Sequence, residues 1–461
     1  MKSLFLGQLM LAVVVVSVSS AATAEKLEYK QCVAIALAQN PELAISRAQI
    51  EQAEAAVRQA QGNKMPRVNL SLTATRSNDA LNAFGMKLGQ RNATFGDFGA
   101  GEFNPANPNV LAVTPRDLNH PDAVNNFNTR IEVLVPVYNG GMVQSYVDTA
   151  KAYVRAAQSG DEVARQQLAK HVLMAYQGVH TARAYIKLAA EARVAAEEYV
   201  RISDKLHKQG MAVKSDVLSA KVNLEDVKVK GVEAKNAEAA ALNQLALLMG
   251  KSLDDPLDVG APVTPEMLAG SPADLRAQAL NEHAGLSALR NQVEGAGAQV
   301  GAARAGKKPQ FNVMLRQDWN DENLGLDAAS YTVAGVLSWS AFDGGVNNAN
   351  IDRAAAQRAE LVAKLRQAEE GIGYQVTDAR RKALEAEEKI VAREAGVEQA
   401  MEAQRLVKKR YENSMATLIE LLGAQAQLDK ANADLVAARY ELAVNRAELK
   451  RSVGVLTADS L

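Results

Sequence analysis

The chain has 461 residues, 48% of them hydrophobic and 5% aromatic, and its formal net charge at pH 7 is −1. A nearly neutral chain without a block of lysines and arginines is not expected to bind nucleic acid. Its single cysteine, Cys32, cannot form an internal disulfide. The five histidines are scattered, and no metal-ligand, nucleophile or dinucleotide motif occurs, so we predict no metal, no cofactor and no enzyme activity.

Residues 1–24 have the organisation of a secretory signal peptide. Lys2 precedes an apolar run over 4–18, and Ala22-Thr23-Ala24 provides the small-x-small pattern at which signal peptidase cleaves. We therefore expect an exported chain that loses these residues. No later run of about eighteen apolar residues follows, so no transmembrane helix is expected.

The remainder of the chain is a duplication. The segment EQAEAAVRQAQGNKMPRVNLSL, which begins at Glu51, aligns with EGAGAQVGAARAGKKPQFNVML, which begins at Glu294, 243 residues later. This alignment pairs Lys64 with Lys307. Further on, VYNGG at 137–141 matches AFDGG at 341–345, at an offset of only 204. The first half therefore carries an insertion of about forty residues, rich in Gly, Asn and Pro, which we expect to be an external loop.

We accordingly divide the chain into two structural repeats of strand pair and helical hairpin. The expected boundaries are a first repeat at 25–250, a linker at 251–272, a second repeat at 273–454 and a tail at 455–461. The first repeat should contain strands at about 66–76 and 126–138, the external loop at 77–125 and a helical hairpin at 141–250. The second should contain strands at about 309–319 and 329–342 and a hairpin at 345–453.

Each predicted strand alternates between apolar and polar residues. In the first, Val68, Leu70 and Leu72 alternate with small polar residues, which places the apolar side chains on one face. Each strand is about ten residues long, enough to cross a bilayer when tilted. A soluble antiparallel sheet packed on a core is the alternative. Four strands cannot close a barrel, so a membrane barrel requires several copies, and three copies supply twelve strands.

The helices are too long for a globular core. Residues 142–207 and 346–411 contain no proline, and each helix would extend about 100 Å. The helix after the second turn has a heptad seam of leucines at 421, 428, 435, 442 and 449, with small residues between them. In the first repeat Glu238 takes the position of one of these leucines. A buried carboxylate without a partner is costly, so we expect Glu238 to reach water or a partner.

Four segments, in this order, carry a resemblance to a known family. They are ALAQNPEL, RIEVLVPVYNGG, KQGMAVKSDVLSA and RYENSMATLIELLGAQAQL. With the duplication, they make the chain similar to the TolC outer-membrane efflux family over its mature length. The resemblance implies a mainly α protein with a transmembrane β-barrel, built as a homotrimer with a twelve-strand barrel and a periplasmic α-helical tunnel.

Function and partners follow from the same resemblance. It implies a passive exit duct in the outer membrane of a Gram-negative bacterium, in contact with outer-membrane lipid and with a large periplasmic portion. The duct would serve a tripartite efflux or type I secretion system and be opened by a periplasmic adaptor protein and an inner-membrane pump. A periplasmic adaptor protein and a soluble periplasmic coiled-coil scaffold are the alternatives; two equivalent hairpins, each after a membrane-length strand pair, favour the duct.

The resemblance also implies site residues. Glu420 matches an acid whose three copies ring the closed tunnel entrance, and Asp216 and Tyr411 match a hydrogen-bonding pair that latches neighbouring hairpins. Ala416 stands where the family has an arginine in that latch. An ordinary solvated helix start is the alternative for both acids. The expected adaptor-docking tips consist of Gly210, Met211, Ser414 and Met415, where Ser414 replaces the usual glycine.

Overall fold

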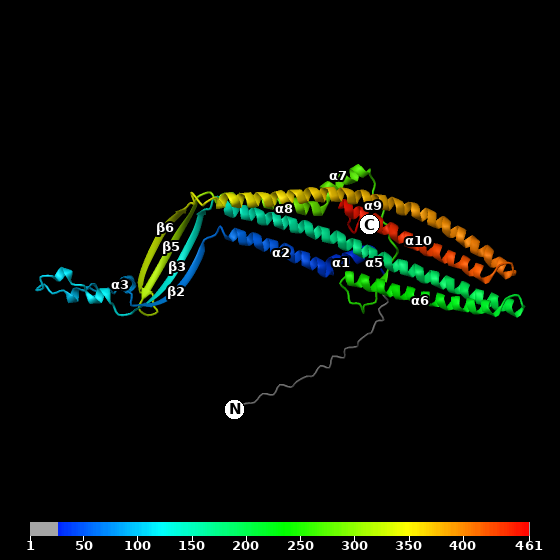
Figure 1. The fold of residues 1–461 in the computed structure, drawn as a ribbon, viewed down its shortest axis with the longest axis horizontal. Helices are drawn as coiled ribbons and strands as arrows, with labels where there is room; N and C mark the ends of the chain where they lie inside the picture. Colours follow the sequence, from blue (N-terminus) through cyan, green and yellow to red (C-terminus); the bar gives the residue numbers. More distant parts are fainter. Residues whose placement is uncertain (1–25, 461) are drawn as a thin grey trace, which may run out of the picture. The chain divides into compact units, whose positions relative to one another are not determined.

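The computed structural model describes residues 26–460, so the expected signal peptide lies outside it. The chain divides into two compact units (Figure 1). Within the described residues, the helical unit comprises 26–44, 163–283 and 372–460, and the sheet unit comprises 45–162 and 284–371. Each unit contains parts of both repeats. No helix within 26–460 is both long and apolar enough to span a bilayer.

The sheet unit is built around one antiparallel sheet of four strands. These are β2 (Arg67–Ser77), β3 (Val124–Tyr138), β5 (Gln310–Asp321) and β6 (Ala328–Ser338). Their order is β2-β3-β5-β6, so the strand pairs of the two repeats join through β3 and β5. Strands β2 and β6 form the two edges. Helices α2 (Pro41–Gly62) and α8 (Ala284–Ala305) lead into β2 and β5 respectively.

The strand register separates the side chains into an apolar face and a polar face. One row across the sheet joins Val68, Val133, Leu315 and Val333. The row on the opposite face joins Ser71, Arg130, Asp318 and Ser330. No other element of the unit covers the apolar face at its edges, where Val68 is 67% exposed and Val333 is 65% exposed. A soluble sheet would bury this face in a core.

The expected external loop is more ordered than its composition indicates. It contains helices α3 (Ala80–Gly89) and α4 (Arg116–Asn119) and three short 3₁₀ turns, η1 (Gly96–Phe98), η2 (Ala100–Glu102) and η3 (Val110–Ala112). Phe84 and Phe98 pack edge to face with ring centroids 4.6 Å apart. A hydrogen bond from Lys87 is the main reason that the pKa of Asp97 falls to about 2. These contacts join residues that are distant in sequence, which composition does not reveal.

The helical unit has its core around helix α1 (Tyr29–Gln39). Tyr29, Cys32 and Val33 are buried against α5 (Met142–Lys208), and the Tyr29 hydroxyl donates to the Ala169 carbonyl at 3.1 Å. Burial raises the pKa of the Cys32 thiol to about 11. The expected linker contributes a short strand, β4 (Asp258–Val259), which pairs in parallel with β1 (Lys26–Leu27), and is followed by α7 (Pro272–Glu282).

The hairpins repeat the duplication at an offset of 204 residues. Helices α5 and α9 (Val346–Glu412) each have 67 residues, and α6 (Lys214–Leu248) and α10 (Leu418–Val453) begin at equivalent positions. A glycine pair in the left-handed region precedes each long helix, with φ of 66° and 91° at 140–141 and of 64° and 93° at 344–345. Glycine adopts this conformation without steric cost, which explains the repeated Gly-Gly.

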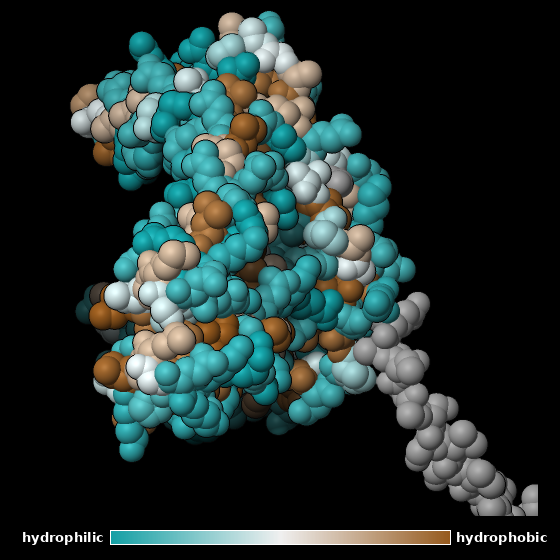
Figure 2. All heavy atoms as spheres, turned by 90° about the vertical axis from the view of Figure 1, so that its right-hand side faces the viewer, coloured by the Kyte–Doolittle hydropathy of each residue, from teal (hydrophilic) through white to brown (hydrophobic). Residues whose placement is uncertain are grey.

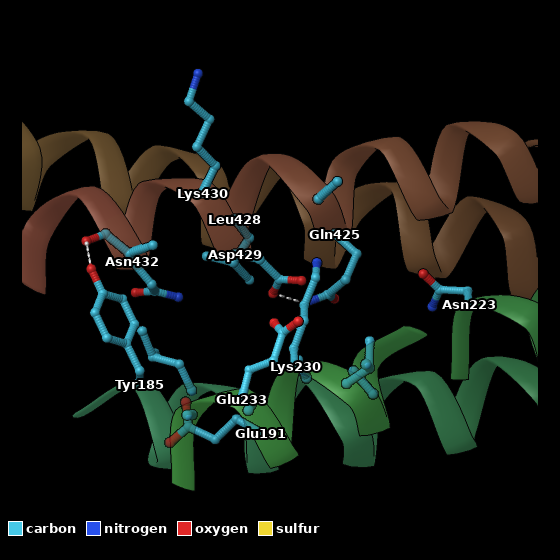
Figure 3. Close-up of a pocket in the computed structure, with 18 of the residues that line it drawn as sticks. Tyr185, Glu191, Asn223, Lys230, Glu233, Gln425, Leu428, Asp429, Lys430 and Asn432 are labelled. Atoms are coloured by element: carbon cyan, nitrogen blue, oxygen red, sulfur yellow. Dashed lines mark hydrogen bonds between the residues drawn. The ribbon is translucent and has the colours of Figure 1, made fainter. Parts of the chain in front are cut away.

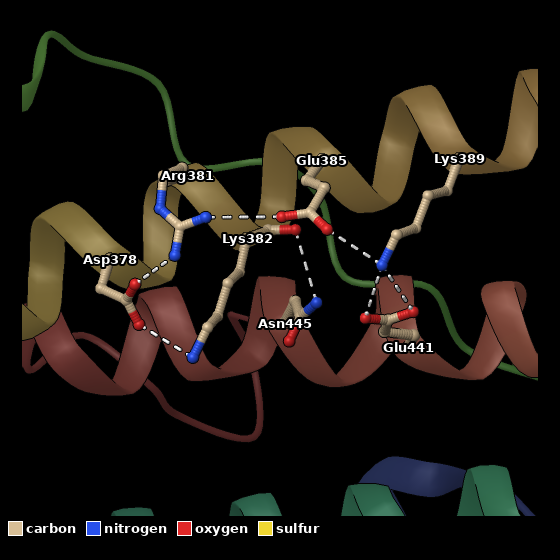
Figure 4. A network of polar contacts seen from close by, with 7 residues as sticks. All are labelled: Asp378, Arg381, Lys382, Glu385, Lys389, Glu441 and Asn445. Carbon is tan, nitrogen blue, oxygen red and sulfur yellow. Dashed lines mark hydrogen bonds and ion pairs between the residues drawn. The ribbon is translucent and has the colours of Figure 1, made fainter.

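Ion pairs join the helices within the helical unit. Lys389 of α9 contacts Glu441 of α10 at 3.3 Å, within a network that extends along α9 to Asp378 (Figure 4). Arg446 of α10 pairs with Glu387 of α9. Of the two alternatives expected for Glu238 of α6, water or a partner, the structure shows a partner, because Arg183 of α5 contacts it at 2.7 Å. The same guanidinium contacts Asp258 of β4 at 2.5 Å and so connects the hairpin to the linker.

Candidate functional site

The two hairpin turns of one chain lie in contact with each other in the helical unit. The Ser414 hydroxyl donates to the Met211 sulfur at 3.4 Å. The turn after α5 contains Gly210 with φ of 75°, and the turn after α9 contains Ser414 with φ of 59°. A serine in the left-handed region is strained, whereas a glycine is not. The structure thus brings together the four residues expected at the tips, which are Gly210, Met211, Ser414 and Met415.

Apolar side chains at the tips are left uncovered. Met211 and Met415 are 62% and 63% exposed, and Ile419 is 83% exposed. Figure 2 faces the hairpin ends and shows apolar patches among the hydrophilic atoms. Methionine is unbranched and polarizable and adapts to varied apolar partners, so an exposed methionine pair is typical of a binding surface.

Glu420 lies in the first turn of α10 and forms a capping box with Thr417. The Thr417 hydroxyl accepts from the Glu420 backbone N–H at 3.2 Å, and the Glu420 carboxylate accepts from the Thr417 backbone N–H at 3.3 Å. Arg410 lies 3.8 Å from the same carboxylate. In one chain the carboxylate therefore has a structural role at the helix start. The same carboxylate is also half exposed.

Asp216 is the equivalent residue in the first repeat, 204 positions earlier. The N-cap of its helix is Val213, which provides no side-chain cap, so this turn lacks the capping box of its counterpart. Within residues 26–460, Asp216 makes no side-chain hydrogen bond to Tyr411. Within one chain, Tyr411 is therefore paired with Ser203 and not with Asp216. The hydroxyl groups of Tyr411 and Ser203 are 2.8 Å apart.

The Tyr411 hydroxyl lies in a small apolar core to which helices α5, α6, α9 and α10 all contribute near the tips. Tyr411 and Ser203 are buried, at 3% and 0% exposure, and Leu418 and Leu421 pack beside them. Burial raises the pKa of the Tyr411 hydroxyl, and the negative charge of Asp216 acts in the same direction. Asp216 thus influences the hydroxyl through its charge. The sequence analysis missed Ser203, because a serine inside a long helix carries no local signal.

A series of hydrogen-bonded polar side chains connects helices of the helical unit near the tips and borders a cavity. Gln404 of α9 donates to the Tyr199 hydroxyl, which donates to Gln425 of α10 at 2.6 Å. Gln425 donates in turn to the Asp429 carboxylate at 2.8 Å. The cavity has a volume of about 740 Å³ between α5, α6, α9 and α10, and Tyr185, Gln404, Asp429 and their neighbours line it (Figure 3).

Burial raises the pKa of the Asp429 carboxyl, although the amide of Gln425 and the charge of Lys230 oppose the shift. A half-buried carboxylate held by a neutral amide is unusual in a helix seam. The sequence analysis missed this network. Gln425 and Asp429 are four residues apart, and each directly follows a seam position, Ala424 and Leu428 respectively, which was the available signal.

These arrangements provide binding surfaces and charged groups, and none of them resembles a reaction centre. A duplicated sheet with an uncovered apolar face, continued into paired helical hairpins with exposed tips, defines a membrane-channel class of transport protein.

The chain belongs to the outer membrane efflux protein family, whose model matches residues 33–251 and 275–455. It is 24% identical over 326 residues to the toluene efflux pump outer membrane protein TtgC of Pseudomonas putida, covering 68% of this chain and 66% of that protein. It is 27% identical over 304 residues to the alkaline protease secretion protein AprF of Pseudomonas aeruginosa, covering 63% and 62%.

The fold agrees with solved structures of the same class. The crystal structure of the outer membrane protein VceC from Vibrio cholerae superposes with a TM-score of 0.74 at 19% identity, covering 92% of this chain and 96% of that one. The sequence prediction of a TolC-like outer-membrane channel is therefore confirmed, and nothing in these comparisons supports the adaptor alternative. The family is one of outer membrane efflux proteins, and this chain shares its fold with the solved outer membrane protein.

Proposed function

We propose that three copies of this chain assemble into the exit duct of a tripartite export system. The four-stranded sheets would combine into a twelve-strand barrel in the outer membrane, and the hairpins into a periplasmic tunnel. The observation that carries this proposal is a sheet with two unpaired edges and an uncovered apolar face.

Edge strands expose unpaired backbone N–H and C=O groups, and a bilayer offers no water to satisfy them. Strands β2 and β6 have 11 residues each and no neighbouring strand on their outer sides among residues 26–460. Pairing β6 of one copy with β2 of the next satisfies both edges and closes the barrel. Twelve strands lie within the range of known outer-membrane barrels, whereas four do not.

The helical unit has an uncovered stripe that supports the same assembly. Four large apolar residues on α6 are between 52% and 62% exposed, and they recur at spacings of four, seven and three residues. They are Leu218, Val222, Val229 and Val232. This is a heptad seam without a partner helix in one chain. A helix of a neighbouring copy with its own apolar stripe would bury it.

The gate of the duct would lie at the hairpin tips. Three copies of Glu420 around a narrow entrance would attract cations and repel anions over a Debye length of about 8 Å. Asp216 and Tyr411 would latch neighbouring hairpins, and Ala416 in place of an arginine would make that latch weak. The tip residues Met211 and Met415 would bind the periplasmic adaptor, which an inner-membrane pump accompanies.

Single-channel recording in planar bilayers tests the gate. Glu420→Gln removes the charge and keeps the capping box, because glutamine serves equally well at this position. We expect weaker cation selectivity, while Asp216→Ala should raise conductance modestly. Glu398→Gln, on the exposed surface of α9, is the control and should behave as wild type. Unchanged selectivity in Glu420→Gln would place the constriction elsewhere.

A further inference from the structure

A duplicated lysine contact lies where each strand pair meets its helices in the sheet unit. Lys64 precedes β2, and its ammonium group donates to the Gln144 side chain in the first turn of α5 at 2.6 Å. Lys307 precedes β5 and donates to the Asn348 side chain in the first turn of α9. The lysines are equivalent in the duplication, and so are the two amides, at offsets of 243 and 204 residues. Both repeats thus hold a lysine against the start of the following helix.

Lys308 adds a third ammonium group beside these two. It donates to the Gly140 carbonyl at 3.1 Å, and its Cβ approaches so closely that a Cβ on Gly140 would lie 2.8 Å away. Lys64, Lys307 and Lys308, here called the junction lysines, are exposed and form no ion pair within residues 26–460. The nearby acid, Asp343, accepts two backbone N–H groups at the start of α9. The junction lysines therefore have no acidic partner among residues 26–460.

Exposed aromatic side chains adjoin the junction lysines. The Trp339 indole donates to the Lys307 carbonyl at 3.0 Å and remains 63% exposed. Trp339 follows Leu337 by two residues and so continues the apolar row of β6. Phe342 and Tyr138 are 90% and 48% exposed at the same end. Tryptophan and tyrosine concentrate at membrane–water interfaces, where the ring contacts acyl chains and the polar atom reaches headgroups.

We propose that the junction lysines bind the phosphate groups of anionic phospholipids in the leaflet that faces the periplasm. This inference rests on the proposed membrane placement of the sheet. The lysine stems would lie along the apolar surface, with their ammonium groups at the level of the phosphates. In a trimer, the duplicated pair Lys64 and Lys307 would supply six such positions around the barrel.

The arrangement fits a lipid surface better than a soluble anion. The lysines lie on the surface and are held apart by separate partners, which are the side chains of Gln144 and Asn348 and the Gly140 carbonyl. They border the exposed apolar face, where acyl chains would lie. A polybasic segment near a membrane gains about fivefold in binding for each lysine at an anionic surface, and salt weakens the effect.

Tryptophan quenching by brominated lipids measures this preference directly. The chain has two tryptophans, so Trp319→Phe leaves Trp339 as the sole fluorophore. The assembled protein is reconstituted into vesicles containing either brominated phosphatidylglycerol or brominated phosphatidylcholine. We expect phosphatidylglycerol to be preferred about fivefold or more at low salt, and the preference to fall at 0.5 M salt, where the Debye length is about 4 Å.

In the same background, Lys64→Gln/Lys307→Gln should abolish most of the preference, and Lys64→Arg/Lys307→Arg should retain it. Lys221→Gln/Lys235→Gln, a matched charge removal on the exposed surface of α6, should leave it unchanged. Equal quenching by both lipids in the parent, or loss of the preference on adding inorganic phosphate at constant ionic strength, would overturn the proposal. Absence of quenching by either lipid would instead refute the membrane placement itself.

Discussion

A cation on the apolar face of the sheet should prevent assembly, whereas a cation on the polar face should not. Val133 lies in β3 in the row that passes through the middle of β5 and β6. Val133→Arg places a guanidinium in hydrocarbon at a cost of about 2–4 kcal/mol per chain, or about 30- to 900-fold in the insertion equilibrium. Asn69→Arg lies one register position away on the polar face, where the new cation faces Glu132. Opposite charges paired across strands contribute a favourable 0.2–1 kcal/mol, roughly.

The assay is the fraction of each variant recovered as a trimer from outer membranes, by native electrophoresis after extraction in mild detergent. Val133→Arg should be depleted strongly and accumulate as unassembled chain, and Asn69→Arg should match wild type. Equal recovery of the two variants would refute the assignment of the faces. Depletion of Asn69→Arg alone would reverse it.

Four further substitutions test individual contacts of the helical unit through thermal unfolding in detergent. Ser414→Gly relieves a left-handed serine and should stabilise the protein by about 0.5–1 kcal/mol; a destabilised variant would show that the turn is not strained. Arg446→Ala leaves half-buried Glu387 without its cation and should cost about 1.5–3 kcal/mol, whereas Arg439→Ala removes an exposed pair and should cost less than about 0.5 kcal/mol. Burial raises the pKa of the Asp429 carboxyl, so ionisation at neutral pH opposes folding. Asp429→Asn should therefore raise the unfolding temperature at pH 7. This gain should vanish as the pH falls below 3.8, the ordinary pKa of an aspartate side chain. A gain that does not depend on pH would contradict this reasoning.

Patterns with a short period were sufficient to predict the architecture. Period-two alternation from Val68 to Leu72 indicated strand and face together, because successive side chains of a strand point to opposite sides. The absence of proline over 142–207 indicated an uninterrupted helix, and α5 ends within a residue of the expected boundary. The internal duplication then transferred each assignment from one repeat to the other.

Contacts between distant segments could not be predicted in this way. Ser203 gives no sign in its own helix that it faces Tyr411, 208 residues later. The short helices of 77–125 depend on pairs such as Lys87 and Asp97 within a segment whose composition is typical of a loop. Strands β1 and β4 pair in parallel although they lie more than 200 positions apart in the sequence. Each strand is only two residues long, which is too short to show any periodicity.

The mass of the detergent-solubilised protein, corrected for bound detergent, tests the central claim most directly. A sheet with open β2 and β6 edges requires partners, so the protein mass should equal that of three chains. The same sample should conduct ions when added to a planar bilayer. A stable single chain that inserts into outer membranes and conducts would contradict the account, because four strands would then have to seal a pore alone.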